Sequence, residues 1–180
     1  MHGLIFREFF LFAEDATSKG FVGDMIRSAD PNGADDYDAL GPYDENRLIA
    51  MMEFLGNRTG YDIPELCHDF GRRLFQRFTE LHPELFASQT NAIDFLEGIE
   101  AHIHEQVRSL EPKSRPPRFD ILRPAPNELV MHYQSHRPFA DLCAGLIEGA
   151  LDHYKENGQV DRRPVGDTNT EAVFTVTTSD

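Results

Sequence analysis

The hydrophobic pattern of this chain changes type at a proline-rich segment near residue 115. Before that segment, apolar residues recur every three or four positions, which predicts amphipathic helices. After Arg115-Pro116-Pro117 the pattern becomes the alternation of short strands, and a helical pattern then returns. The sequence therefore predicts an α+β fold: a mainly helical N-terminal part packs on a C-terminal part with a small antiparallel sheet and helices.

Helix boundaries follow from capping and turn residues. Asp30-Pro31-Asn32-Gly33 predicts a loop, and Asp62 with Pro64 predicts a helix start. We expect the buried face of that helix to carry Leu66, Phe70, Leu74, Phe78 and Leu81. Six helices are predicted: 5–16, 21–26, 48–55 with an end near Gly56 or Gly60, 62–81, the long uninterrupted 92–110 ended by Pro112, and 138–154.

Gly71 lies in the middle of the predicted helix 62–81. Glycine there costs about 1 kcal/mol relative to alanine. Either a bulky group approaches the backbone at this point, or the helix simply tolerates the residue.

Three strands are expected in the C-terminal part. Segments 119–122 and 128–133 are joined by Pro124-Ala125-Pro126-Asn127 and predict a hairpin. Segment 172–177 alternates apolar and polar residues, so it is expected to pair with that hairpin after a polar stretch.

The charge excludes some classes of partner. The 180 residues include 17 Lys and Arg against 31 Asp and Glu, a formal charge of −14. Such a chain repels phosphate backbones and anionic lipids, which argues against nucleic acid and membrane surfaces. No segment approaches the roughly 20 apolar residues of a membrane span, and the first residues lack a signal-peptide pattern. We expect a cytoplasmic protein.

Cys67 and Cys143 are the only cysteines, too few for a disulfide framework or an all-cysteine zinc site. Each falls on an apolar helical face, where a free cysteine usually packs.

Tyr133, Ser135 and Arg137 are spaced by two at the end of a predicted strand, so their side chains are expected on one side. Two hydroxyls and a guanidinium suit the binding of two neighbouring carboxylates. The simpler interpretation is that these three residues form the solvent-exposed face of a strand. His132 and His136 would then face the opposite way, toward solvent.

His102 and His104 lie on opposite edges of the apolar stripe of helix 92–110. Periodicity does not choose between them, and either could be an ordinary surface residue. HExxH, glycine-rich phosphate loops and recognisable hydrolase signatures are missing from the sequence.

Several motifs, in order, resemble the H-NOX family, the haem nitric oxide/oxygen binding domain related to the haem domain of soluble guanylate cyclase. The resemblance runs from residue 1 to about residue 155, and the spacing of its motifs makes it specific. The matching segments are Met1-His2-Gly3, Ile103 to Pro112 around the family's proximal histidine, Arg115-Pro116-Pro117-Arg118-Phe119, the Y-x-S-x-R motif Tyr133-Gln134-Ser135-His136-Arg137, and Gly145 to Gly149.

The resemblance implies a single H-NOX-like domain over residues 1–180, with a helical subdomain 1–60 and a haem-carrying part 61–180 with haem b between them. It favours His104 as the iron ligand and implies that Tyr133, Ser135 and Arg137 hold the haem propionates. Pro117 would lie against the porphyrin, although it also resembles a plain helix-ending proline. The implied pocket consists of Ile5, Phe9, Leu74, Phe78, Pro117, Leu142, Cys143 and Leu146.

The gas follows from one position. Relatives that hold O2 use a tyrosine where this chain has Leu142, because bound O2 needs a hydrogen-bond donor. The supporting positions, Phe9 and Leu74, are also apolar. The resemblance therefore implies an NO sensor that binds NO and CO at ferrous haem and does not stably bind O2. A zinc site at Cys143 is disfavoured, because His153 is its only obvious companion.

The implied protein is a stand-alone sensor and not an enzyme. NO would weaken or break the bond from iron to His104, and the signal would pass to a separate protein such as a histidine kinase or a cyclic-di-GMP cyclase or phosphodiesterase. One alternative is a haem-free helical interaction module of the same fold. A haem redox enzyme is less favoured, because the apolar residues Phe9, Leu74 and Leu142 on the gas-binding side of the haem offer no acid or base.

Overall fold

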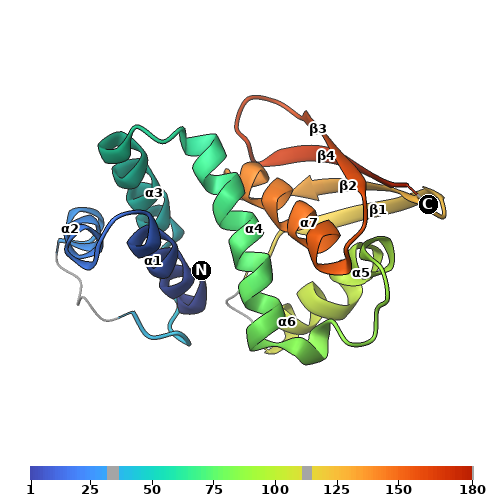
Figure 1. Cartoon of the computed structure of the whole chain (residues 1–180), viewed down its shortest axis with the longest axis horizontal. Helices are drawn as coiled ribbons and strands as arrows, with labels where there is room; N and C mark the ends of the chain where they lie inside the picture. Colours follow the sequence, from blue (N-terminus) through green and yellow to red (C-terminus); the bar gives the residue numbers. More distant parts are fainter. Residues whose placement is uncertain (32–36, 111–114, 180) are drawn as a thin grey trace.

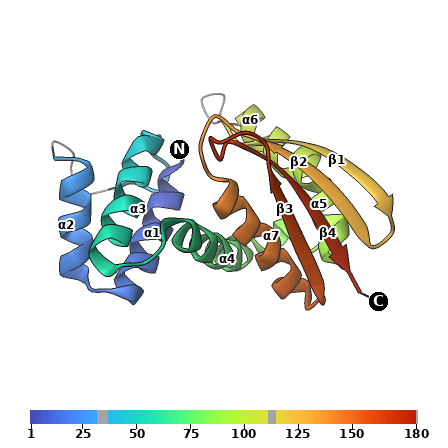
Figure 2. The same cartoon turned by 90° about the horizontal axis from the view of Figure 1, so that it is seen from above.

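The computed structural model describes residues 1–31, 37–110 and 115–179 (Figure 1). Helices α1 to α3 lie on one side of the central helix α4, and α7 and the sheet lie on its other side (Figures 1 and 2). The expected α+β layout is confirmed. Within the described ranges no helix is long and apolar enough to cross a membrane. The predictions on Asn32, Gly33 and Pro112 lie outside the described residues.

Side-chain caps fix where the first four helices begin. The four caps each accept a hydrogen bond from a backbone N–H of the first turn, which satisfies a donor that has no partner within the helix; they are His2, Ser18, Asp44 and Asp62. At the other end of α3, Gly60 has φ 77°, a left-handed conformation suited to glycine. The helices are α1 (Gly3–Ala16), α2 (Lys19–Ala29), α3 (Glu45–Thr59) and α4 (Ile63–Leu81).

Glycine is required at the third position. A Cβ added to Gly3 would lie 1.8 Å from the carbonyl oxygen of Asp38. The Gly3 N–H donates to Gly41 O at 2.9 Å, and Leu4 N–H to Ala39 O at 2.9 Å. These bonds hold the start of α1 against the segment 38–43, so the third residue has no room for a side chain.

The helix α4 packs against α7 (Ala140–Tyr154) at van der Waals distance of the two backbones. A Cβ on Gly71 would lie 2.3 Å from Leu142 O, and one on Gly145 would lie 1.9 Å from His68 O. Of the two interpretations of Gly71, the close approach is therefore correct, and the approaching group is the backbone of α7. The prediction that Leu81 belongs to the buried face of α4 is wrong, because Leu81 is 42% exposed.

The predicted long helix 92–110 is not uninterrupted. It consists of α5 (Ala92–Ile99), a π-helix η2 (Glu100–His104) and α6 (Glu105–Leu110). In the π segment, the Glu105 N–H donates to the Glu100 carbonyl, five residues back. Single π turns inside helices are frequent at functional sites, and the apolar spacing carries no signal for them. Before α5, a short 3₁₀-helix η1 covers Pro83–Leu85.

The sheet has four antiparallel strands in the order β1-β2-β4-β3. The predicted hairpin and the pairing of the last strand are confirmed. The sequence prediction missed β3, since Gly158–Pro164 carries almost no buried side chain and lies at the sheet edge. The strands are β1 (Arg118–Ala125), β2 (Glu128–Gln134), β3 (Gly158–Pro164) and β4 (Glu171–Thr178).

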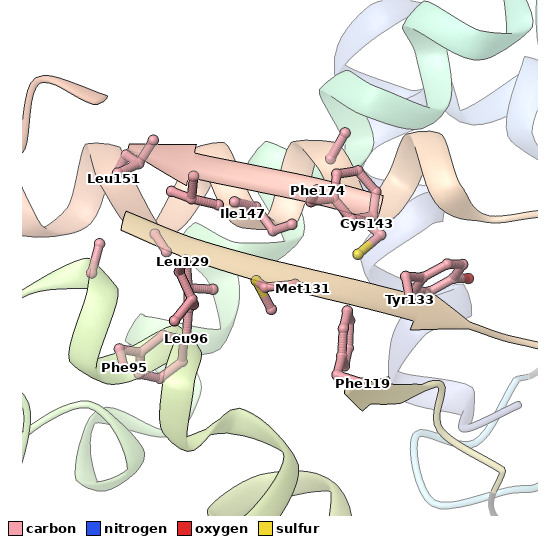
Figure 3. Packing of buried hydrophobic residues seen from close by; sticks show 14 of the residues in the cluster. Phe95, Leu96, Phe119, Leu129, Met131, Tyr133, Cys143, Ile147, Leu151 and Phe174 are labelled. Carbon is pink, nitrogen blue, oxygen red and sulfur yellow. The ribbon is translucent and has the colours of Figure 1, made fainter. Parts of the chain in front are cut away.

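Among the residues that the structure describes, the buried ones form two apolar clusters, one on each side of α4. The sheet cluster joins β2, β4, α5 and α7 and includes Met131 and Phe174, which lie opposite each other (Figure 3). The helical cluster joins α1 to α4 and includes Phe9 and Phe70. Partly buried side chains of α4 and α7 pack against both clusters, namely Phe78 and Leu146.

Candidate functional site

His104 is the last residue of the π-helix, and its side chain is only 14% exposed. Its ring stacks on Phe119 of β1, with centroids 5.7 Å apart and planes at 22°. Its Nδ1 lies 3.2 Å from a carboxylate oxygen of Glu100. Burial lowers the pKa of His104, and the opposing contacts with Glu100 and the Pro117 carbonyl do not reverse this. The imidazole is therefore neutral at pH 7, the form that donates a lone pair to a metal.

His102 has a different environment. It is exposed, and its ring folds back over Gly98, where an added Cβ would lie 2.8 Å from His102 Cδ2. Periodicity does not distinguish the two histidines, but in the structure His104 is mostly buried and His102 is exposed. Only His104 faces the sheet cluster, through its contact with Phe119.

The three donors of the Y-x-S-x-R motif lie together. Tyr133 is 2% exposed at the end of β2, and its hydroxyl points away from the other labelled side chains (Figure 3). Burial raises its pKa, although hydrogen bonding with the Ser135 hydroxyl opposes the shift. Ser135 Oγ accepts the Arg137 N–H at 3.1 Å. Because β2 ends at Gln134, Ser135 and Arg137 belong to the following loop, so strand alternation alone does not place them.

Arg137 brings a cation to this loop. Its side chain is 12% exposed, and its Nε lies 3.4 Å from Glu45 Oε1 at the start of α3. That Nε is buried and has no hydrogen-bond partner among the described residues. A buried, unsatisfied guanidinium N–H is costly unless an acceptor reaches it. The loop is therefore equipped to bind an anionic oxygen.

The neighbouring histidines are not purely solvent-facing. His136 is exposed as expected, and its Nε2 lies 2.9 Å from Glu45 Oε1. His132 is half-buried, with Nε2 2.6 Å from Glu171 Oε1 on the adjacent strand β4. His132 faces away from Tyr133 as expected, and cross-strand pairing in addition supplies a carboxylate that single-strand alternation does not reveal.

The apolar residues of the expected pocket fall into two groups. Phe9, Leu74 and Leu142 are buried in the helical cluster, and Cys143 in the sheet cluster. Four others are only half-buried, although none carries a polar side-chain atom: Ile5, Phe78, Pro117 and Leu146. Of these, Phe78 and Leu146 border both clusters. Incompletely covered apolar side chains at such a boundary suit an apolar ligand lying between the clusters.

Two surface hollows lie elsewhere. One, of about 400 Å³, is lined by the first turns of α4, by Tyr61 before it and by Asp141. The other, of about 420 Å³, lies between α1 and α4. Neither includes His104 or the Y-x-S-x-R residues, so we attach no ligand to them.

The cysteines are both free and buried, as expected. No cluster of three or more His, Cys, Asp or Glu side chains able to hold a metal ion is found where the structure describes the chain. His153 packs against Phe75 and Phe86 at the far end of α7 from Cys143.

The family model described as Haem-NO-binding matches residues 2–162. The chain belongs to this family. H-NOX domains are haem-binding gas-sensor domains, so the expected family and fold are both confirmed. A search among curated proteins gives no match.

Solved H-NOX structures share the fold along their whole length. The unliganded Fe(II) A71G mutant from K. algicida is 25% identical with a TM-score of 0.91, over 100% of this chain and 97% of that one. The Fe(II)CO form from Shewanella woodyi is 29% identical with a TM-score of 0.85, over 99% and 95%. The Fe(II)NO form from S. oneidensis is 18% identical with a TM-score of 0.91, over 100% of both chains.

The residues present fit the haem that this family binds. A neutral buried histidine suits ferrous iron, the unsatisfied Nε of Arg137 suits a propionate, and the half-buried apolar boundary suits a porphyrin face. Sequence reasoning missed Glu45, whose contact with Arg137 joins distant parts of the chain, and Glu100, which contacts His104 within the same helical segment. Only the i, i+4 spacing of Glu100 and His104 could have indicated one of them.

Proposed function

We propose that this H-NOX protein is a haem b sensor of nitric oxide in which His104 is the iron ligand. When bound, the haem iron supplies the site for NO and CO. The observation that carries the proposal is the burial of His104 against Phe119, while the neighbouring His102 is exposed. The relatives in Fe(II)NO and Fe(II)CO states support these ligands.

Tyr133, Ser135 and Arg137 hold the two propionates in this proposal. Their hydroxyls and guanidinium supply charge-assisted and neutral hydrogen bonds to carboxylate oxygens. Arg137 then exchanges part of its contact with Glu45 for a propionate oxygen, which also satisfies its buried Nε. We further propose the subdomain boundary near residue 60, where Gly60 ends α3.

The apolar residues on the gas-binding side of the haem, here called the distal wall, determine which gas is bound stably. Phe9, Leu74 and Leu142 offer no side-chain donor, so bound O2 would lack the hydrogen bond that stabilises its partial negative charge. NO and CO need no such donor. The same wall supplies no general acid or base, so we propose a sensor and not an enzyme.

The signal passes to a separate protein, for which we propose a histidine kinase or a cyclic-di-GMP cyclase or phosphodiesterase. The family match covers residues 2–162 and the solved H-NOX chains match the chain throughout, so these residues belong to the sensor domain itself. A cytoplasmic location belongs to the same proposal, since two free thiols suit a reducing compartment.

Absorption spectra of reconstituted protein test the assignment. Wild type and His102→Ala should show the Soret band of a histidine-ligated ferrous haem that binds NO and CO. His104→Ala should lose that ligation and regain a fifth ligand when imidazole is added. Loss of haem in His102→Ala with retention in His104→Ala would contradict the ligand assignment. A wild type without a Soret band would favour the haem-free interaction module.

A further inference from the structure

Glu100 is the first residue of the π-helix that His104 ends. Its Oε2 lies 3.2 Å from His104 Nδ1 and accepts the Phe119 backbone N–H at 3.2 Å. Its other oxygen, Oε1, accepts a hydrogen bond from Arg108 Nη2 at 2.6 Å. A carboxylate with three donors around it has little freedom to turn away from the histidine.

Two of the three donors come from the helical segment that contains Glu100, and the third comes from β1. His104 and Arg108 follow Glu100 by four and eight residues, so they lie on one face of the continuous helical segment. Phe119 belongs to β1, where its ring also stacks on the imidazole. The i, i+4 spacing therefore brings Glu100 and His104 together, and strand β1 holds both the carboxylate and the ring in place.

A carboxylate on the second ring nitrogen has a defined effect on a metal-bound histidine. It holds the proton on Nδ1, leaves Nε2 as the ligating atom, and raises the electron donation of the ring to the metal. A nearby cation acts in the opposite direction, because it draws charge from the same carboxylate. Glu100 and Arg108 should therefore have opposite effects on the donor strength of His104.

We propose that Glu100 is a positioning residue for the iron ligand, which fixes the His104 ring and strengthens its bond to iron, and that Arg108 limits this strengthening. The inference rests on the proposed function, since it requires haem on His104. It adds a property set by this chain's own residues. The carboxylate of Glu100 opposes release of His104 from iron, so the bound gas must weaken the bond from iron to His104 more strongly before the histidine is released.

Resonance Raman spectra of the ferrous, ligand-free holoprotein test the proposal through the iron–histidine stretching frequency. Glu100→Gln keeps the size and an acceptor but removes the charge, so the frequency should fall. The haem midpoint potential should rise, and haem should dissociate about 10-fold faster. Arg108→Met should shift the frequency and the potential the other way. Glu105→Gln, an exposed neighbour on the next turn, removes the same charge and should change neither.

A purely structural ion pair would give a different result. If Glu100 and Arg108 only stabilised the helix, both variants would lower the melting temperature and shift the frequency in the same direction or not at all, and either outcome overturns the proposal. If Glu100→Gln does not fold, Arg108→Met decides alone, and a frequency that fails to rise overturns the proposal. A wild type that takes up no haem would instead overturn the proposed function, and this inference with it.

Discussion

Gly71 of α4 meets the backbone of α7 at Leu142, where an added Cβ would lie 2.3 Å from the carbonyl oxygen. The same Cβ would lie 3.0 Å from Leu146 N. Both neighbours are backbone atoms of a helix, so they cannot turn aside as a flexible side chain would. This contact fixes how closely α7 approaches α4, and therefore the position of Leu142 and Leu146, two residues of the proposed pocket.

Gly71→Ala should lower the free energy of unfolding by about 1–3 kcal/mol, because the extra methyl group forces α4 and α7 apart. Urea unfolding measures this loss. Gly20→Ala is the matched control, since its Cβ would meet only Ser18 Oγ at 4.0 Å. It should gain roughly 0.4–1 kcal/mol from reduced freedom of the unfolded chain. Equal stability of the two variants would show that the helices separate without cost.

Leu142→Tyr should give the distal wall a hydrogen-bond donor. Leu142 is buried in the same cluster as Phe9 and Leu74, so a new hydroxyl there is shielded from water and available to bound O2. The ferrous variant should form an O2 complex that persists in air, seen by absorption spectroscopy. Leu142→Phe has nearly the same size without the hydroxyl and should bind no O2, as in wild type. A stable O2 complex of the wild type itself would refute the proposed gas selectivity.

Both cysteines should resist alkylation in the folded protein. Burial raises the pKa of Cys67 to about 12 and raises that of Cys143 as well. Only the thiolate reacts, and a pKa near 12 leaves about 10⁻⁴ of Cys67 ionised at pH 8. Iodoacetamide followed by mass spectrometry should label neither thiol in native protein and both in concentrated urea. Because the folded pKa is raised, labelling of native protein should increase only as the pH rises well above 9. Rapid labelling at pH 8 would mean that the two helices open.

Asp141 ties α7 to the edge strand β3. It contacts Arg162, which also contacts Asn169, and the Arg162 Nε is buried without a hydrogen-bond partner among the described residues. Asp141→Ala removes an acceptor from that guanidinium and should cost about 1.5–3 kcal/mol in the free energy of unfolding.

The control is Asp152→Ala on the same helix. Asp152 pairs with Arg72, but its side chain is 58% exposed, and exposed pairs contribute up to about 1 kcal/mol. Thermal or urea unfolding of both variants measures the difference. If Asp152→Ala were the more damaging change, the importance assigned to the Arg162 contact would be wrong.

Most helices and the hairpin could be predicted because local rules specify them. Asp62 and Gly60 cap helices through hydrogen bonds and backbone conformations that involve only neighbouring residues. The π-helix at Glu100 and the strand at Gly158–Pro164 could not be predicted in this way. The first changes the hydrogen-bond partners and not the apolar spacing, and the second is specified by pairing with β4.

The candidate site likewise has one part that the sequence predicts and one part that it does not. The sequence by itself determined the identities and spacing of Tyr133, Ser135 and Arg137, since that motif lies within five residues and is recognised by family resemblance. Only the tertiary structure brought Glu45 to Arg137 and placed Glu100 and His104 against Phe119 of β1. The physical reason is that a charge acts through distance in space, and the packing of α3 and β1 sets those distances.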